Sequence, residues 1–246
     1  MRPNKNIGEW YHALSKDISM GGRVNIPRDM EEWPKSWKTV EYKHYKRCPS
    51  VPLLPLEQCR LVNPLTDTLF SRKSNRDFEE RGYVMTHKVL STFIANTISK
   101  TKGNYRIYPS GGARYPLEFY FFLKRSSDMA LGIYHYNVED HALTLLKGIE
   151  HIDLSSRPIH GYEWANHTAV DVFISAIFER NFRKYGERGY RYVMLEAGHV
   201  SQNFYLVSTA LGLSSTAVAG VLDINVEDML YLDGKYESLV HTFLLG

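Results

Sequence analysis

Two arginines and a serine recur at every second position in the segment SRKSNRDF, namely Arg72, Ser74 and Arg76. In an extended chain this spacing projects all three side chains toward one side. A pair of guanidinium groups, each a permanent cation with bidentate donors, suits a phosphate dianion. The three residues are therefore a candidate phosphate site. From spacing alone a solvated basic turn is the favoured alternative, because runs of surface charge are usually only hydrated.

A glycine-containing segment, PSGGARYP, lies between a helical pattern and a predicted strand. Gly111 and Gly112 let the backbone pass close to a flat ligand, and N–H groups exposed after Pro109 and Ser110 could bond to ring heteroatoms. A plain turn explains two glycines equally well. The spacing matches neither a Walker loop nor a GxGxxG fingerprint, which excludes those two nucleotide motifs.

A lysine and a tyrosine, Lys184 and Tyr185, follow a predicted strand and precede a long helix, a position from which side chains reach clefts. Either would be a general base if burial or the neighbouring cations Arg183 and Arg188 lowered its pKa from the ordinary value of about 10. The favoured alternative from the residues alone is a solvated, charged connection.

The long helix carries three polar residues, Glu196, His199 and Asn203, at i, i+3 and i+7, and so on one narrow face. No HExxH or comparable pair accompanies them, and a histidine satisfied within the helix is the favoured interpretation. We assign no metal. Cys48 and Cys59 are the only cysteines, so a multi-cysteine zinc site is excluded, while a single bridge between them stays open.

Several regular elements must position these residues. Apolar spacing from Met85 to Lys100, with Thr86 as N-cap, predicts a surface helix. A second helix, from Gly189 to Leu213, is apolar on nearly all sides and is predicted to be central. The density of β-branched and aromatic residues predicts buried strands at 117–123 and 169–178, a hairpin at 132–146 and a closing strand at 239–245. Without a regular βαβ repeat, this pattern favours an α+β fold.

The chain of 246 residues is long enough for one sizeable core, and no linker divides it. Residues 1–65 hold seven of the ten prolines and three of the four tryptophans, which predicts an N-terminal arm lying over a body at 66–246. The net charge is only +3 and its cations are scattered, which argues against nucleic acid. Neither a signal-peptide h-region nor a membrane span is visible, so we expect a cytoplasmic protein with no membrane contact.

Several motifs in order resemble one family. Five motifs, spread over about residues 65–246, are similar to those of the SagB-type dehydrogenases. They are R-x-S-x-R, PSGGARYP, GIYHY, KYGERGYRYVMLEAGHVSQNFYL and ALGL. These enzymes form the azoline-oxidising branch of the FMN-dependent nitroreductase superfamily. The arm adds YHALSKD, similar to the usual opening of that family. The resemblance implies a nitroreductase-like fold, in which helices flank a central mixed or antiparallel sheet and a long buried helix forms the dimer interface.

The resemblance also implies a role for each candidate residue. Lys184 and Tyr185 match the Lys-Tyr pair associated with catalysis in this branch. In the superfamily the flavin lies between two subunits, so a homodimer is implied. The positions matching FMN contacts are Arg72, Ser74 and Arg76 for the phosphate and ribityl chain, Pro109, Ser110, Gly111 and Gly112 along the isoalloxazine edge, Ala217, Val218, Ala219 and Gly220 on its other side, and Asn203 near the dimer seam.

The activity implied is dehydrogenation of thiazoline or oxazoline rings in a modified peptide, beside a cyclodehydratase partner and with dioxygen as the final acceptor. Two alternatives remain open at this point. One is an NAD(P)H-dependent reductase of nitroaromatic or quinone-type acceptors on the same fold, although Ala219 stands where many such enzymes have a carboxylate. The other is a non-catalytic scaffold within a peptide-modification complex.

Overall fold

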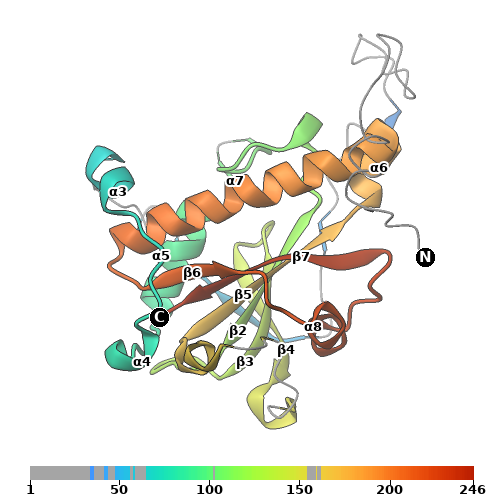
Figure 1. The fold of residues 1–246 in the computed structure, drawn as a ribbon. Helices are drawn as coiled ribbons and strands as arrows, with labels where there is room; N and C mark the ends of the chain where they lie inside the picture. Colours follow the sequence, from blue (N-terminus) through green and yellow to red (C-terminus); the bar gives the residue numbers. More distant parts are fainter. Residues whose placement is uncertain are drawn as a thin grey trace, which may run out of the picture.

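One seven-stranded sheet carries the fold of the computed structural model, which describes residues 34–35, 42–43, 48–55, 58, 65–101, 103–153, 159 and 162–246 (Figure 1). The strand order is β1-β4-β3-β2-β5-β7-β6, and every neighbouring pair is antiparallel. The strands are β1 (Ser50–Pro52), β2 (Leu117–Leu123), β3 (Gly132–Asn137), β4 (Ala142–Gly148), β5 (Val170–Ile177), β6 (Ser215–Val218) and β7 (Glu237–Leu245). The α-helices of the described part are α3 (Leu65–Ser71), α4 (Phe78–Arg81), α5 (His87–Thr97), α6 (Glu179–Tyr185), α7 (Gly189–Ala210) and α8 (Asp223–Leu230).

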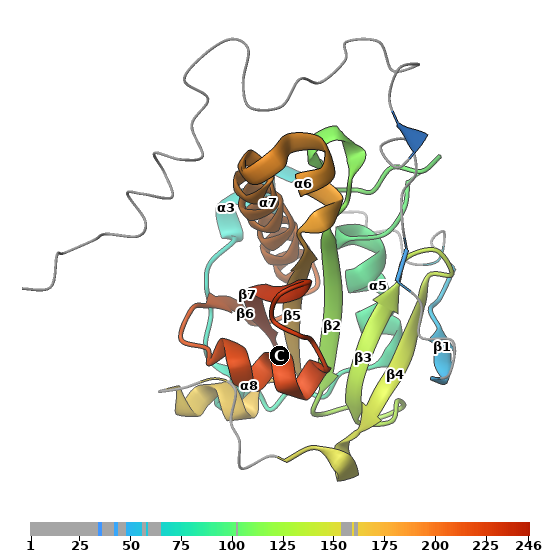
Figure 2. The same cartoon turned by 90° about the vertical axis from the view of Figure 1, so that its right-hand side faces the viewer.

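The central strands β2 and β5 are apolar runs because helices cover both faces of the sheet, and every residue of both strands is buried. On one face Phe119 packs with Phe93 of α5 and Phe204 of α7. On the other face Phe122 packs with Val226 of α8. Figure 2 shows α5 and α8 on opposite sides of the sheet. This arrangement of an antiparallel sheet between helices confirms the predicted α+β class.

Helix α5 begins after Thr86, whose side chain accepts a hydrogen bond from the Val89 N–H, so the predicted N-cap is confirmed. The helix is shorter than the expected 85–100. The expectation of a surface helix was wrong, because seven of its eleven residues are buried, Phe93 and Ile94 among them. The reason is tertiary: α7 crosses the face of α5 that a lone amphipathic helix would leave in water.

Helix α7 has 22 residues and runs across the sheet as the longest helix in Figure 1. Val193, Val200 and Phe204 lie on its buried side. The opposite side is not covered by the described part of the chain, since the side chain of Leu195 is 56% exposed. The helix that the sequence predicts to be apolar on nearly all sides and central is therefore covered on one side only by the described part of a single chain.

The predicted hairpin is confirmed, with β3 and β4 joined after Asn137, whose side-chain oxygen accepts from the N–H groups of Glu139 and Asp140. Most of the predicted N-terminal arm lies outside the described residues, as does Cys59. Among the residues that the structure describes, no helix is both long enough and apolar enough to span a bilayer.

Candidate active site

Residues 109–113, here called the glycine loop, form a tight turn that leads into β2. Gly112 has φ 62° and Ala113 has φ 53°, so two consecutive residues lie in the left-handed region. Ser110 holds the turn closed: its carbonyl accepts from the Ala113 N–H at 3.1 Å, and its Oγ accepts from the Tyr115 N–H at 2.9 Å. A non-glycine residue in this conformation costs about 1–3 kcal/mol, and such strain is common where backbone approaches a ligand.

The lysine and tyrosine proposed for catalysis pack against this loop. A Cβ added to Gly112 would lie 2.2 Å from Tyr185 Oη and 2.9 Å from Lys184 Nζ. Both polar ends therefore occupy the space that a side chain at position 112 would need. The sequence places these residues about 70 positions apart, and the fold brings them into contact.

Lys184 and Tyr185 belong to helix α6 and not to a solvated connection, which corrects the interpretation favoured by the residues alone. Lys184 is 2% exposed and Tyr185 is half-buried. Helix α6 ends at Gly186, whose φ of 56° suits glycine, and a short 3-10 turn then leads into α7. Both side chains therefore come from the last turn of α6, directly before the α6–α7 corner.

The surroundings shift the pKa values of the pair in opposite directions. Burial lowers the pKa of Lys184, and the neighbouring Arg114 cation lowers it further. Burial raises the pKa of Tyr185, so its phenol keeps its proton at neutral pH. The neutral amine of Lys184 is therefore easier to form than that of an exposed lysine, and the phenolate of Tyr185 is harder to form than that of an exposed tyrosine.

Sequence reasoning missed Tyr192, the residue that supports this corner. Its ring packs edge-on against Tyr185 with centroids 4.9 Å apart, and its Cβ would lie 3.4 Å from a Cβ at Gly111. Its hydroxyl accepts from Arg188 Nε at 3.2 Å. The sequence does place a tyrosine in the first turn of the long helix, shortly after the Lys-Tyr pair. The direction of its side chain depends on how α6 and α7 are joined, and the sequence does not show this.

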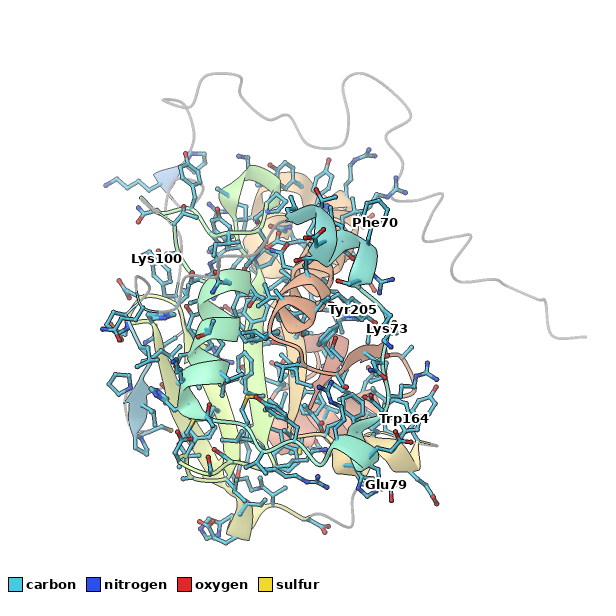
Figure 3. All side chains as sticks on the ribbon, turned by 90° about the vertical axis from the view of Figure 1, so that its left-hand side faces the viewer. Phe70, Lys73, Glu79, Lys100, Trp164 and Tyr205 are labelled. Carbon is cyan, nitrogen blue, oxygen red and sulfur yellow. The ribbon has the colours of Figure 1, made fainter. Side chains whose placement is uncertain are left out.

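A second group of residues meets at the other end of α7. Ser74 Oγ lies 3.0 Å from Tyr205 Oη, and the Arg72 guanidinium lies over the Tyr205 ring, 5.2 Å from its centroid. Tyr205 Oη also accepts from the Ala217 N–H at 2.8 Å. We call Arg72, Ser74, Tyr205 and Ala217 the Tyr205 cluster. Figure 3 labels Tyr205. Tyr205 was not predicted, because it reads as part of an apolar helix.

Arg76 points elsewhere than Arg72 and Ser74. Its guanidinium lies 5.3 Å from the ring centroid of Trp164, which in turn stacks on Phe78 at 5.9 Å. The predicted one-sided projection of all three side chains is thus seen for the first two only. The segment is fixed between them by the Asn75 N–H, which donates to the Ser215 carbonyl at 2.8 Å.

The predicted flavin-side segment lies beside the Tyr205 cluster. Ala217 and Val218 belong to the edge strand β6, which pairs with β7, and Ala219 and Gly220 follow directly. Val218 is buried whereas Ala219 is exposed. The structure therefore brings this segment together with the R-x-S motif. This proximity is what a binding site shared by the two segments would require.

The polar residues along α7 have separate environments. Asn203 Nδ2 donates to the Thr97 carbonyl at 3.3 Å, which ties α7 to the end of α5. This contact joins it to neither group described above, so its role in cofactor binding stays a prediction. His199 is exposed and Glu196 is buried. Within the described ranges, no group of three or more His, Cys, Asp and Glu side chains could hold a metal ion.

The two groups lie far apart in one chain. Tyr192 marks the end of α7 that contacts the glycine loop, and Tyr205 marks the other. Thirteen residues at 1.5 Å each separate them by ~20 Å along the helix axis. A single chain therefore presents cationic donors at one end of α7 and the Lys184-Tyr185 pair at the other.

The comparison with known families settles the relationship. The model of the nitroreductase family matches residues 69–246, which contain both groups. The chain belongs to the nitroreductase family. Trifolitoxin-processing protein TfxB of Rhizobium leguminosarum bv. trifolii is 32% identical over 265 aligned positions, covering 96% of this chain and 69% of TfxB. This similarity confirms the expected resemblance to the peptide-processing branch.

Solved structures share the fold. The Escherichia coli microcin synthetase McbBCD complex, solved with truncated pro-MccB17 bound, matches with a TM-score of 0.63 at 21% identity over 98% of this chain and 91% of that one. A Desulfovibrio desulfuricans protein solved in complex with FMN matches with a TM-score of 0.52 at 15% identity over 75% of this chain and 86% of that one. At these identities the likeness shows the fold, and the expected nitroreductase-like architecture is confirmed.

Proposed function

We propose that this nitroreductase-family oxidoreductase binds FMN and dehydrogenates thiazoline or oxazoline rings of a modified peptide to thiazole or oxazole. The observation that carries the proposal is the contact of Lys184 and Tyr185 with Gly112. It puts a proton acceptor and a phenol beside a loop whose backbone is open to a flat ligand. The similarity to TfxB, which processes trifolitoxin, supports a peptide substrate.

The residues present fit FMN. Arg72 forms no salt bridge with another described residue, and with Ser74 it offers donors for a phosphate. The glycine loop has no side chain at Gly111 or Gly112 to block a ring, and Gly112 is exposed. The Desulfovibrio desulfuricans protein shows that this fold holds FMN in a relative.

Two copies of the chain are needed to complete this site. If α7 of one copy packs antiparallel against α7 of a second, the Tyr205 cluster of each faces the Lys184-Tyr185 pair of the other. The uncovered side of α7 suits such an interface, since Leu195 is 56% exposed. On α3, which contacts α7, Phe70 is 88% exposed (Figure 3). We therefore propose a homodimer with two composite sites.

Bound FMN would supply the acceptor for the hydride that leaves the azoline ring. Side chains of the protein would accept the proton and orient the substrate ring. Lys184 Nζ, whose pKa is lowered by burial, accepts the ring proton that leaves with the hydride. Tyr185, protonated at neutral pH, donates a hydrogen bond that orients the ring. Tyr192 and the glycine loop hold these groups in place through direct contacts.

The proposed partners are a modified peptide and a cyclodehydratase that forms its azoline rings. A dehydrogenase of this kind uses a product that another enzyme must first cyclise, and the fold match to the McbBCD complex agrees with such an assembly. Dioxygen is the proposed final acceptor of the electrons.

The first experiment is the visible absorption spectrum of the purified protein, followed by heat release and identification of the chromophore. Flavin bands with FMN in the supernatant are the expected result. A colourless protein that also fails to bind added FMN would contradict the cofactor assignment.

The second experiment compares substrates with the FMN-loaded protein. We expect oxidation of an azoline peptide, seen as a loss of two mass units per ring, without added NAD(P)H. Faster oxidation of NAD(P)H with a nitroaromatic would instead select a small-acceptor reductase. An absence of turnover with both would favour a scaffold.

Arg72 should contribute most to phosphate binding. Arg72→Ala is expected to weaken FMN binding by about 10- to 100-fold, because charge-assisted hydrogen bonds contribute about 1.5–3 kcal/mol each. The dissociation constant is measured by flavin fluorescence titration. Lys73→Ala is the matched control, since Lys73 is an exposed neighbouring cation, and its effect should stay within about two-fold. Equal losses in both variants would show that general charge, and not this site, holds the phosphate.

A further inference from the structure

One buried acid behind the glycine loop has no role in the chemistry above. Glu196 of α7 is 1% exposed, and neither of its carboxylate oxygens forms a well-aligned hydrogen bond with a described residue. A buried carboxyl group without a partner is costly, and such groups usually serve a ligand or a local structure.

The glycine loop packs on α7 one turn before Glu196, where Tyr192 Cβ lies 3.4 Å from a Cβ built at Gly111. The Ser110 hydroxyl and the Gly111 N–H lie close enough to act on its ionisation. The Ser110 oxygen already accepts from the Tyr115 N–H at 2.9 Å, which leaves the hydroxyl proton free to be donated. A carboxyl group behind the loop is the matching acceptor.

The charged neighbours of Glu196 are engaged with other groups. Arg180 Nη1 donates to the Glu118 carboxylate at 2.6 Å, and Arg106 Nη1 donates to Tyr108 Oη at 2.8 Å. Burial raises the pKa of Glu196 to about 8, against the opposing effects of Arg106 and Arg180. At neutral pH the group is therefore a neutral carboxylic acid that can accept and donate hydrogen bonds.

We propose that Glu196 is a positioning residue, which sets the shape of the glycine loop by hydrogen bonding to Ser110 and to the Gly111 N–H. Because the loop also contacts Lys184 and Tyr185, Glu196 acts on the reacting groups through the loop. Its effect on FMN binding rests on the function proposed above. Its effect on the loop does not depend on that function.

Amide hydrogen exchange of the cofactor-free protein tests the loop directly. The reporters are the N–H groups of Ala113 and Tyr115, both of which donate to Ser110. Glu196→Ala should raise their exchange rates by roughly ten-fold, whereas Glu196→Gln, which keeps the shape and the hydrogen bonds, should stay within about two-fold of wild type. Ser208→Ala is the matched control, since Ser208 is buried on α7 and its hydroxyl donates to the Phe204 carbonyl, away from the glycine loop.

Stability against pH gives a second readout. From about pH 4.5 to 8 the folded protein keeps the Glu196 proton that the unfolded chain loses, so the free energy of unfolding falls as pH rises. Arg106, Arg180, Tyr108 and Tyr115 face this carboxyl. The pKa values of Arg106, Tyr108 and Tyr115 are raised, so these three groups keep their charge states across that range. In Glu196→Gln the free energy of unfolding should lack this part of its dependence on pH.

FMN titration completes the test. Glu196→Ala is expected to weaken FMN binding by about ten-fold and Glu196→Gln to leave it nearly unchanged. Unchanged exchange at Ala113 and Tyr115 in Glu196→Ala, or equal losses in the alanine and glutamine variants, would overturn the positioning role. A wild-type protein that binds no FMN would contradict the proposed function alone, because the exchange result is obtained without the cofactor.

Discussion

Replacing Lys184 by methionine is expected to slow azoline-peptide oxidation by about 10²- to 10⁴-fold, the usual contribution of a positioned general base. Methionine keeps the unbranched shape of a side chain that is 2% exposed, so the fold should be preserved. The measurement is kcat/KM with an azoline peptide, together with the FMN content of the variant.

The matched control is Arg183→Met, which removes the neighbouring cation of the same helix. Arg183 Nε pairs with the Glu179 carboxylate at 3.1 Å on the exposed side of α6, so its loss should change the rate by less than about two-fold. If Lys184→Met retained wild-type kcat/KM with full FMN content, Lys184 would not be the base.

The pH profile follows from the same group. Only the neutral amine accepts a proton, so kcat/KM should rise with pH, with a midpoint below 10.5 because burial and Arg114 lower the pKa of Lys184. Tyr185→Phe should keep this rise while lowering the plateau, since the Tyr185 phenol stays protonated. Loss of the rise in Tyr185→Phe would instead identify the tyrosine as the titrating base.

The second large effect is expected from Gly112→Ala. The new Cβ would lie 2.2 Å from Tyr185 Oη and 2.9 Å from Lys184 Nζ, so the polar ends of both side chains must move. A displacement of about 1 Å at a reacting centre can reduce the rate by about 100-fold. Oxidation of the azoline peptide is measured beside the thermal midpoint of unfolding.

Gly82→Ala is a close control for this substitution. Gly82 also has a positive φ, 52°, but nothing lies within 4 Å of a Cβ built there. Both variants should lose about 1 kcal/mol of stability from the left-handed backbone, while only Gly112→Ala loses activity. Equal activity losses in the two variants would attribute the effect to backbone strain and not to the contact with Lys184 and Tyr185.

The local elements of this fold were predictable because they depend on neighbours in sequence. The Thr86 side chain caps α5 by accepting a hydrogen bond from the Val89 N–H, three positions later. In the β3–β4 turn the Asn137 side chain accepts from the N–H groups of Glu139 and Asp140. The motifs R-x-S-x-R and PSGGARYP likewise lie within short segments, and the family match over residues 69–246 bears out the resemblance that they carry.

Contacts across the fold were not predictable in this way. Tyr205 meets Ser74 across 131 positions, and Lys184 in the last turn of α6 meets Gly112 of the glycine loop. The direction of each pKa shift also depends on burial, which separates Lys184 from Tyr185 although the two are adjacent in sequence.

By itself, the sequence determined the class of fold, the family and the residue types available for chemistry, because hydrophobic periodicity, caps and turns act over a few residues. Only the tertiary structure decided which of those residues meet. It separated the Tyr205 cluster from the Lys184-Tyr185 pair by the length of α7, and it buried Glu196 behind the glycine loop. Packing of distant segments excludes water and fixes side-chain direction, and no local pattern encodes either property.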